Sequence, residues 1–328
     1  MYIPELKFSL WADFIERDFL EGEFKQMIEK KIINGATSNP AIFKNAILTS
    51  AAYKQQIASL KDIGAKEIYE AVAIYDIQKA ADALLPLHVK GDDGYVSIEI
   101  DPFLCDNADE SIKEGKRLYT QIDRPNVMIK VPATKAGYIV MEALVAEGIA
   151  VNATLVFKKE QAVACAEAFK RGALVGKKEV DSVISVFVSR IDRALDDNLK
   201  ALGIVTSLSG IYNAADIYST IESLHVKRCR TLFASTGVKG DTLKKAYYIS
   251  ALLAKNSVNT APIDTIYAFI EDDDKSAKLP IDKKTIQEHF LLIERAGIDF
   301  DAILDRQIED GLDAFKVAFS EILQALEV

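Results

Sequence analysis

One lysine stands inside an apolar stretch, where its amine could act as a nucleophile. The segment Asn126–Val131 reads NVMIKV, and Pro132 follows it directly. Burying the Lys130 ammonium group would cost several kcal/mol and favour the neutral amine. A neutral amine can attack a carbonyl carbon and form a Schiff base. Two structural explanations compete with this one, because the side chain could reach the surface from a strand end or pair with a carboxylate.

Acidic and amide side chains occur in segments that could lie beside this lysine. The stretch 95–101 (YVSIEID) alternates polar and apolar residues, so that every second side chain lies on one face. The residues on the polar face are Tyr95, Ser97, Glu99 and Asp101. The stretch 151–157 (VNATLVF) places Asn152 and Thr154 together in the same way. If these stretches are neighbouring strands, Glu99 lies one strand away from Lys130.

Asp13 and the segment 37–40 could belong to a functional site, but each also has a simple structural explanation. Asp13 follows the apolar LWA, just where a helical pattern begins, so it could be an N-cap. In the segment 37–40 (TSNP), Thr37 and Asn39 could bind a substrate. Asn39 is equally a good N-cap, because Pro40 suits the first turn of a helix.

Two segments later in the chain could bind an anion. The stretch SVFVSRID places Arg190 at the end of a predicted strand, with Ser185 and Phe187 inside that strand. The stretch FASTGVKGD offers the hydroxyl of Ser235 and the ammonium of Lys239. Barrel enzymes often bind phosphate in the loops after late strands. A simple turn before a helix explains the second segment equally well, and it lacks the Walker A spacing.

Short strand-like runs alternate with helical patterns along most of the chain. The predicted strands are 8–13, 35–38, 95–101, 127–132, 151–157, 182–189, 230–235 and 257–263. The predicted helices are 15–31, 41–60, 66–87, 109–121, 138–147, 159–173, 191–200, 214–224 and 241–255. Eight strand–helix units in 328 residues favour a closed barrel of parallel strands over two doubly wound domains.

We therefore expect an α/β fold, a (β/α)8 TIM barrel with additional N-terminal and C-terminal helices. Residues 1–328 should form a single domain, because no Pro/Gly/Ser-rich linker divides the chain. Residues 282–328 should form a helical extension that packs on the barrel. The acidic run 271–275 (EDDDK) should be a solvated loop that joins the two parts. In such a barrel the active site lies at the carboxyl ends of the strands, where these polar residues would gather.

Composition narrows the possible partners and the compartment. The net charge is −9, which disfavours nucleic acid, and no apolar run is long enough to span a membrane. The N-terminus lacks the apolar core of a signal peptide. The cysteines (Cys105, Cys165 and Cys229) are odd in number and widely spaced, as expected for free thiols in the cytoplasm. Three distant histidines disfavour a metal site or a Ser-His-Asp triad. A monomer and a homodimer both remain open.

Four of these segments resemble the transaldolase family. They are G-A-T-S-N-P at 35–40, I-K-V-P-A-T-K-A-G at 129–137, N-A-T-L-V-F at 152–157 and F-V-S-R-I-D at 187–192. The resemblance extends over nearly the whole chain, and the C-terminal extension is similar to that of the longer transaldolases. It implies a cofactor-free and metal-free transferase of the non-oxidative pentose phosphate pathway. Such an enzyme transfers a dihydroxyacetone unit from sedoheptulose 7-phosphate or fructose 6-phosphate to erythrose 4-phosphate or glyceraldehyde 3-phosphate.

The resemblance also implies a role for each candidate residue. Lys130 would form the Schiff base, and Asp13 would exchange a proton with the C4 hydroxyl of the ketose. Glu99 and Thr154 would hold and use a water molecule. The substrate-binding residues would be Thr37, Asn39, Asn152, Ser185, Phe187, Arg190, Ser235 and Lys239. Many transaldolases have a second arginine after strand seven, whereas this chain has Ser235 and Lys239 in that region.

Two alternatives to a transaldolase stay open. A fructose 6-phosphate aldolase of the same superfamily would release dihydroxyacetone instead of transferring it. Those proteins tend to carry glutamine and tyrosine where this chain has Glu99 and Phe187, which favours the transaldolase. A non-catalytic phosphosugar-binding barrel would have no need for Lys130, Asp13 and Glu99 together.

Overall fold

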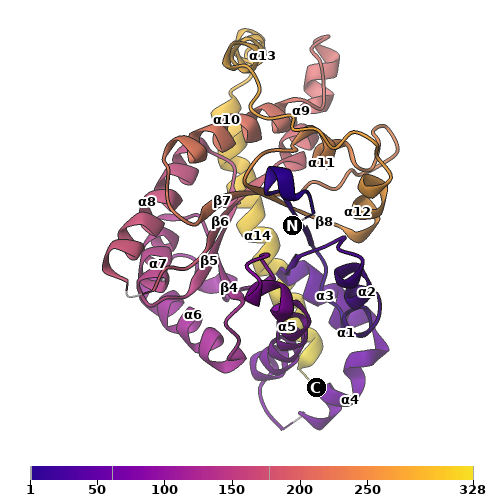
Figure 1. Ribbon diagram of the computed structural model, residues 1–328, viewed down its shortest axis with the longest axis vertical. Helices are drawn as coiled ribbons and strands as arrows, with labels where there is room; N and C mark the ends of the chain where they lie inside the picture. The colour runs from indigo at the N-terminus through magenta and orange to yellow at the C-terminus, as the bar shows by residue number, and fades with distance from the viewer. Residues whose placement is uncertain (1, 61, 177, 328) are drawn as a thin grey trace.

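Eight parallel strands close into a barrel at the centre of the computed structural model, which describes residues 2–60, 62–176 and 178–327 (Figure 1). The strands are β1 (Ser9–Ala12), β2 (Gly35–Thr37), β3 (Tyr95–Glu99), β4 (Val127–Pro132), β5 (Ala150–Val156), β6 (Ser182–Phe187), β7 (Cys229–Ala234) and β8 (Ser257–Ala261). Each strand pairs with its neighbours in chain order, and β8 returns to β1. The predicted (β/α)8 barrel is confirmed.

Helices surround the barrel, and the apolar faces of the strands pack against them. The helices between the strands are α1 (Arg17–Glu21), α2 (Glu23–Glu29), α3 (Pro40–Thr49), α4 (Lys54–Ser59), α5 (Ala65–Val89), α6 (Ala108–Ile122), α7 (Lys135–Ala146), α8 (Lys159–Val175), α9 (Ser189–Ala201), α10 (Ser209–Ser223) and α11 (Tyr247–Ala251). Short 3₁₀ turns lie at Pro4–Leu6, Ala51–Tyr53 and Pro102–Leu104. Val96 and Ile98 of β3 point to this helical layer and are fully or almost fully buried. No helix among the described residues is long and apolar enough to cross a membrane.

The interior of the barrel at the amino ends of the strands is filled by apolar side chains, among which Trp11 is the largest. Trp11 is fully buried, and its indole N–H donates to Asp93 at 3.0 Å. A Cβ atom on Gly35 of the adjacent β2 would lie 2.5 Å from the indole ring. Glycine at this position therefore allows the tryptophan to occupy the interior, as close packing of the barrel requires.

Two predicted long helices are each broken in the structure. The predicted helix 15–31 divides into α1 and α2 at Gly22, which has φ −115° and ψ −93°. The predicted helix 41–60 divides into α3 and α4 at Ser50, whose backbone is extended and whose hydroxyl accepts from the N–H of Ala52. Both residue types favour such breaks, because glycine is flexible and serine competes for backbone hydrogen bonds.

The predicted helix 241–255 is wrong at both ends, because only Tyr247–Ala251 is helical. Residues 241–246 are irregular, and α11 begins only at Tyr247. Between Val238 and Ala246 the only large apolar side chain is Leu243, so a helix here would have little apolar surface to bury. Gly240 adopts φ +78°, which also prevents a continuous helix.

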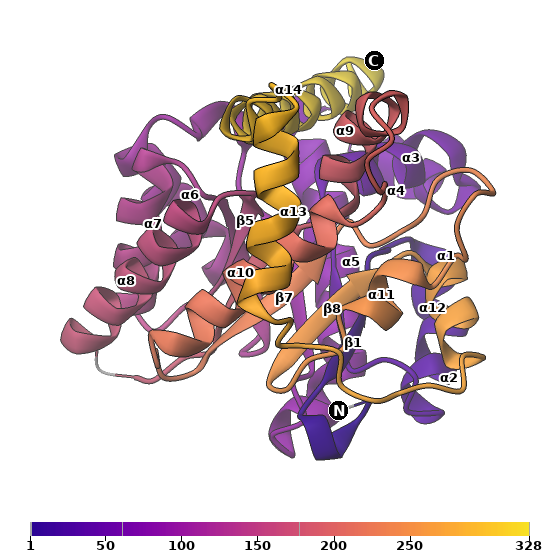
Figure 2. The ribbon, with the colours of Figure 1, turned by 90° about the horizontal axis from the view of Figure 1, so that it is seen from above.

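The C-terminal helices cross the molecule instead of continuing the ring around the barrel. Residues 271–275 lie in the loop that joins α12 (Ile263–Ile270) to α13 (Lys283–Arg295). The long helix α14 (Phe300–Leu326) then lies across the end of the barrel opposite the N-terminus (Figure 2). It contacts α3, α5, α9 and β5.

Candidate active site

Lys130 and Glu99 lie side by side on neighbouring strands. The β3–β4 register pairs Glu99 with Lys130 directly, as the alternation of β3 predicts. Lys130 is 5% exposed, and its Nζ lies 3.6 Å from Oε2 of Glu99. The same Nζ donates to the backbone oxygen of Ser38 at 3.0 Å. Lys130 is therefore buried and beside a carboxylate, and the alternative in which it reaches the surface is wrong.

The residues after Lys130 hold the end of β4 against the next helix. Thr134 caps α7, because its Oγ1 accepts from the N–H of Gly137 at 3.0 Å. A Cβ atom on Gly137 would lie 2.0 Å from the backbone oxygen of Pro132. Only glycine permits this close approach of helix and strand, which explains why this part of the lysine segment contains a glycine.

Asp13 is held by hydroxyl groups and is not a helix cap. The cap of α1 is Glu16, whose carboxylate accepts from the N–H of Phe19. Asp13 instead accepts from Oγ1 of Thr37 at 2.6 Å, and Thr37 lies 2.6 Å from the hydroxyl of Thr260 on β8. Because Thr37 gives its only hydroxyl proton to Asp13, Thr260 must donate to Thr37. Two threonines thus orient this carboxylate.

Three polar side chains inside the barrel, from β3, β5 and β6, are joined by hydrogen bonds next to Lys130. The amide of Asn152, which is paired with Lys130 in the β4–β5 register, donates to Oγ of Ser97 at 3.1 Å. Ser185 donates to the amide oxygen of Asn152 at 2.6 Å. These bonds hold Asn152 in one orientation next to Lys130. The register of β5 shifts between Ala153 and Val156, so a bulge lies at the end of this strand.

Glu99 and Thr154 have unused hydrogen-bonding capacity. Both carboxylate oxygens of Glu99 and the hydroxyl of Thr154 are buried and make no hydrogen bond within the described residues. A buried carboxylate or hydroxyl without a partner costs about 1–3 kcal/mol. This cost would be removed by a water molecule or a substrate oxygen bound beside these groups.

A cavity of about 190 Å³ at the carboxyl ends of the strands collects most of the predicted residues. Eight of the twelve line it: Asp13, Thr37, Asn39, Lys130, Ser185, Phe187, Arg190 and Ser235. Glu99, Asn152 and Thr154 are buried around Lys130 but do not line the cavity. Asn39 has both expected roles, because it lines the cavity and its side chain also caps α3 through the N–H of Ile42.

One end of the cavity carries positive charge. The guanidinium of Arg190 lies over the ring of Phe187, 5.1 Å from its centroid. Ser235, whose backbone oxygen accepts from the N–H of Ser189 at 3.0 Å, has a left-handed backbone conformation with φ +55°. Such conformations in residues other than glycine cost energy and gather at functional sites. Lys239 is exposed on the loop after β7 and does not line the cavity.

Five cavity residues were not predicted from the sequence, and they are Ala41, Ala234, Thr260, Ala314 and Phe315. Thr260 could have been found, because it is a polar residue near the end of the predicted eighth strand. Ala314 and Phe315 come from α14, and the ring centroid of Phe315 lies 5.9 Å from Nζ of Lys130. No local signal in the sequence indicates that this helix forms a wall of the cavity.

Burial sets the protonation of the two carboxyl groups. It raises the pKa of Glu99 to about 7, although the nearby Lys130 opposes the shift. It also raises the pKa of Asp13, against the attraction of Lys130 and the hydrogen bond from Thr37. Both groups can therefore change protonation nearer to neutral pH than an ordinary carboxyl group, as proton transfer requires.

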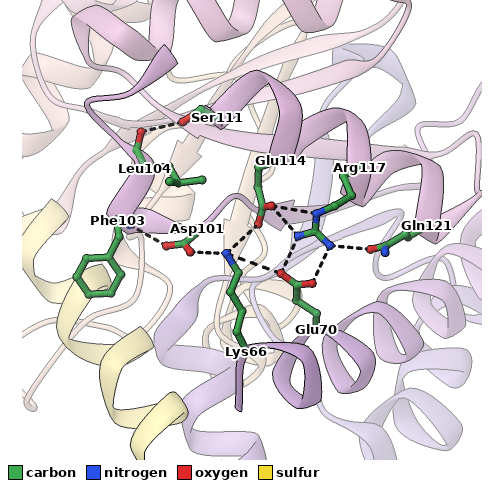
Figure 3. A network of polar contacts seen from close by, with 9 residues as sticks. All are labelled: Lys66, Glu70, Asp101, Phe103, Leu104, Ser111, Glu114, Arg117 and Gln121. Carbon is green, nitrogen blue, oxygen red and sulfur yellow. Dashed lines mark hydrogen bonds and ion pairs between the residues drawn. The ribbon is translucent and has the colours of Figure 1, made fainter. Parts of the chain in front are cut away.

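Asp101 does not share the face of Glu99, contrary to the expected alternation. Strand β3 ends at Glu99, and Asp101 turns outward to accept from Lys66 at 2.6 Å. Figure 3 shows Lys66 between Asp101 and the carboxylates of Glu70 and Glu114. Arg117 pairs with Glu70 and Glu114 as well. The network ties the chain just after Glu99 to α5 and α6.

A barrel with a buried lysine, flanking carboxyl groups and a cationic end defines a class of carbonyl-handling enzymes that act through a lysine amine. The family described as Transaldolase/Fructose-6-phosphate aldolase matches residues 10–326. The chain belongs to this family. A transaldolase of Campylobacter jejuni (strain 81-176) is 48% identical over 97% of this chain and 99% of its own. A transaldolase of Helicobacter pylori (strain Shi470) is 46% identical with the same coverage.

Proposed function

We propose that this protein is a transaldolase, which transfers a dihydroxyacetone unit between sugar phosphates through a Schiff base on Lys130. The observation that carries the proposal is the buried Lys130 amine in a cavity that also contains Asp13, with Glu99 3.6 Å from the amine. The donor would be sedoheptulose 7-phosphate or fructose 6-phosphate. The acceptor would be erythrose 4-phosphate or glyceraldehyde 3-phosphate, as in the non-oxidative pentose phosphate pathway.

The first half of the reaction forms and uses the Schiff base. The amine of Lys130 attacks the ketose C2, and the carbinolamine loses water to give a protonated imine. Glu99 and Thr154 hold this water and move its protons, which is supported by their unpartnered oxygens. The carboxylate of Asp13 then takes the proton of the C4 hydroxyl. The C3–C4 bond breaks, its electrons move into the imine, and the aldose leaves.

The second half reverses these steps with a new aldehyde. The three-carbon enamine stays bound to Lys130 until its nucleophilic carbon attacks the acceptor carbonyl. Asp13 returns its proton to the new hydroxyl group, and water then hydrolyses the imine to release the ketose and the amine. Thr37, Asn39, Asn152 and Ser185 bind sugar hydroxyls or orient Lys130, and Phe187 lines the sugar site. Arg190 and Ser235 bind the phosphate group.

The proposal includes two statements about the whole chain. Residues 1–328 form one domain in which 282–328 packs on the barrel, and the contacts of α14 with α3, α5, α9 and β5 support this. The protein works in the cytoplasm. In support of this location, Cys105, Cys165 and Cys229 are all free and buried.

A coupled assay separates transfer from simple cleavage. Fructose 6-phosphate is supplied with and without erythrose 4-phosphate, and glyceraldehyde 3-phosphate and free dihydroxyacetone are measured separately. We expect rapid formation of glyceraldehyde 3-phosphate only when the acceptor is present. Accumulation of free dihydroxyacetone at a rate that does not depend on the acceptor would instead identify a fructose 6-phosphate aldolase.

A further inference from the structure

Two arginines on α9 have no carboxylate partner. Arg190 and Arg193 lie three positions apart, so their side chains are neighbours on the helix. The chain has ten arginines, and seven of them form ion pairs. Within the described part of the chain, Arg190, Arg193 and Arg295 form none. Arg190 lines the cavity and Arg193 lies one helical turn away from it, and two neighbouring cations of this kind are suited to an anion.

The acid between the two arginines in the sequence, Asp192, already accepts from other donors. Asp192 is buried, and its carboxylate accepts from the N–H of Gly210 at 2.7 Å and from the hydroxyl of Tyr248 at 2.9 Å. Burial lowers the pKa of both Arg190 and Arg193, and Arg193 lowers that of Arg190 further. A phosphate dianion bound here would relieve the repulsion between the two guanidinium groups.

A hydrogen-bond chain connects Arg193 to the cavity. Nη1 of Arg193 donates to Oγ of Ser189 at 3.1 Å, and this Oγ lies 3.2 Å from Oγ of Ser235. A guanidinium group can only donate, so one lone pair of Ser189 is occupied and its proton is free to point to Ser235. When Ser189 gives this proton to Ser235, the hydroxyl proton of Ser235 is left to point elsewhere. Ser235 lines the cavity together with Arg190.

We propose that Arg193 is a positioning residue for the phosphate end of the substrate: through Ser189 it holds the hydroxyl of Ser235 as a donor into the cavity. Its charge also adds to that of Arg190 at the same end. Arg193 and Lys239 are both exposed and neither lines the cavity, but the hydrogen bonds through Ser189 link Arg193 to it, which makes Arg193 the second cation of the phosphate site. The inference rests on the proposed function, because it assumes a phosphorylated substrate.

The first test compares a phosphorylated with an unphosphorylated donor. For Arg193→Met we expect KM for fructose 6-phosphate to rise about tenfold with little change in kcat, the effect of one charge-assisted contact. The kcat/KM for fructose, measured at high concentration, should stay at the wild-type value. Ser189→Ala should give a smaller rise in KM, because the charge of Arg193 remains. An equal loss for both donors, or an unchanged KM, would overturn the proposal.

Matched variants control for charge and folding. Arg295 is the other arginine without an ion pair, and it lies at the last turn of α13 outside the cavity, so Arg295→Met should leave KM unchanged. Arg193→Lys keeps the charge but not the planar fork, so it should recover part of the affinity. Thermal unfolding of each variant shows whether the fold is intact.

A binding measurement separates this inference from the proposed function. Calorimetric titration with inorganic phosphate needs no turnover, and we expect Arg193→Met to bind phosphate more weakly than the wild type by about tenfold. Equal phosphate affinity would refute the role of Arg193 while leaving transfer intact. Absence of transfer in the wild type would refute the proposed function. A larger loss in Lys239→Met than in Arg193→Met would assign the second cation to Lys239.

Discussion

Lys130 and Glu99 lie in one buried environment, and the proposed reaction uses them in different steps. Both are almost fully buried, and the Glu99 carboxylate makes no hydrogen bond within the described residues. Burial without partners is costly for stability but keeps the carboxyl group close to a change of protonation. The strand register places this group 3.6 Å from the amine that would form and lose the imine.

The pH dependence of the reaction tests the role of Glu99. Its pKa is raised to about 7, so Glu99 is a carboxylate above pH 7 and neutral below it. If Glu99 accepts a proton, kcat/KM must fall as the pH drops through about 7. In Glu99→Gln, kcat/KM should be much lower, and its fall as the pH drops through about 7 should be absent. If kcat/KM of Glu99→Gln still fell near pH 7, the group that titrates there would be another one, such as Asp13.

The sequence predicts residues of the site where a strand carries them. The alternation in β3 predicts which face carries Glu99, and the apolar residues around Lys130 predict that it lies in a buried strand. The observed pairing of Glu99 with Lys130 agrees with both predictions. Lys239 follows the last residue of β7 by five positions, and its place depends on a loop that no periodicity describes. Arg193 was missed because a charged residue on a helix looks like solvated surface.

Helix α14 turns the open end of the barrel into a cavity. Ala314 and Phe315 line this cavity, and Gly311 lets the helix come close to the barrel, since a Cβ atom there would lie 2.8 Å from the Leu155 side chain. A wall of this kind would keep water from the enamine that the proposed reaction forms on Lys130. Transfer to an acceptor is then favoured over release of the three-carbon unit.

Removing the aromatic wall should change the fate of the enamine. In Phe315→Ala we expect the ratio of free dihydroxyacetone to transferred product to rise about tenfold, or ~1.4 kcal/mol, because water gains access beside Lys130. The ratio does not depend on how much enzyme is folded. Val317→Ala is a matched control on the same helix, because Val317 is 56% exposed, and its ratio should not change. An unchanged ratio in Phe315→Ala would refute the shielding role.

The elements themselves were predicted better than their interruptions. Periodicity reports where apolar side chains can be buried, and it located all eight strands and most helices. The breaks at Gly22 and Ser50 depend on single residues within otherwise helical patterns. The path of α14 over the barrel depends on tertiary contacts, which a helical pattern does not specify.

At the scale of the whole molecule, the two ends of the barrel carry different kinds of polar contact. The end with Lys130 has the unpartnered oxygens of Glu99 and Thr154, whereas a buried ion pair lies at the opposite end. There Asp93 accepts from the indole of Trp11 at 3.0 Å and pairs with Arg230 at 2.6 Å, both largely buried. In barrel enzymes this opposite face contributes stability rather than catalysis.

This division predicts a variant that loses stability and keeps its catalytic constants. Asp93→Ala leaves the largely buried guanidinium of Arg230 without its carboxylate partner, which should lower the free energy of unfolding by about 3–5 kcal/mol. Denaturant unfolding measures the loss, and KM for fructose 6-phosphate should be unchanged in the folded variant. Glu147→Ala removes an exposed ion pair with Lys116 and should have little effect. A large change in KM with normal stability in Asp93→Ala would contradict the division.

The net charge of −9 describes the molecule and not its site. Lys130, Arg190 and Arg193 lie in or beside the cavity, while many carboxylates lie on outer helices in exposed ion pairs such as that of Glu147. An acidic protein can therefore attract an anionic sugar phosphate locally.

The central claim is that Lys130 forms a Schiff base with a ketose phosphate. The direct measurement is to incubate the protein with fructose 6-phosphate, reduce it with borohydride and map the adduct by mass spectrometry. The account predicts a stable three-carbon adduct on the peptide that contains Lys130. It also predicts no adduct and almost no turnover in Lys130→Arg, since a guanidinium remains protonated. No adduct in the wild type, or an adduct on another lysine, would contradict the claim.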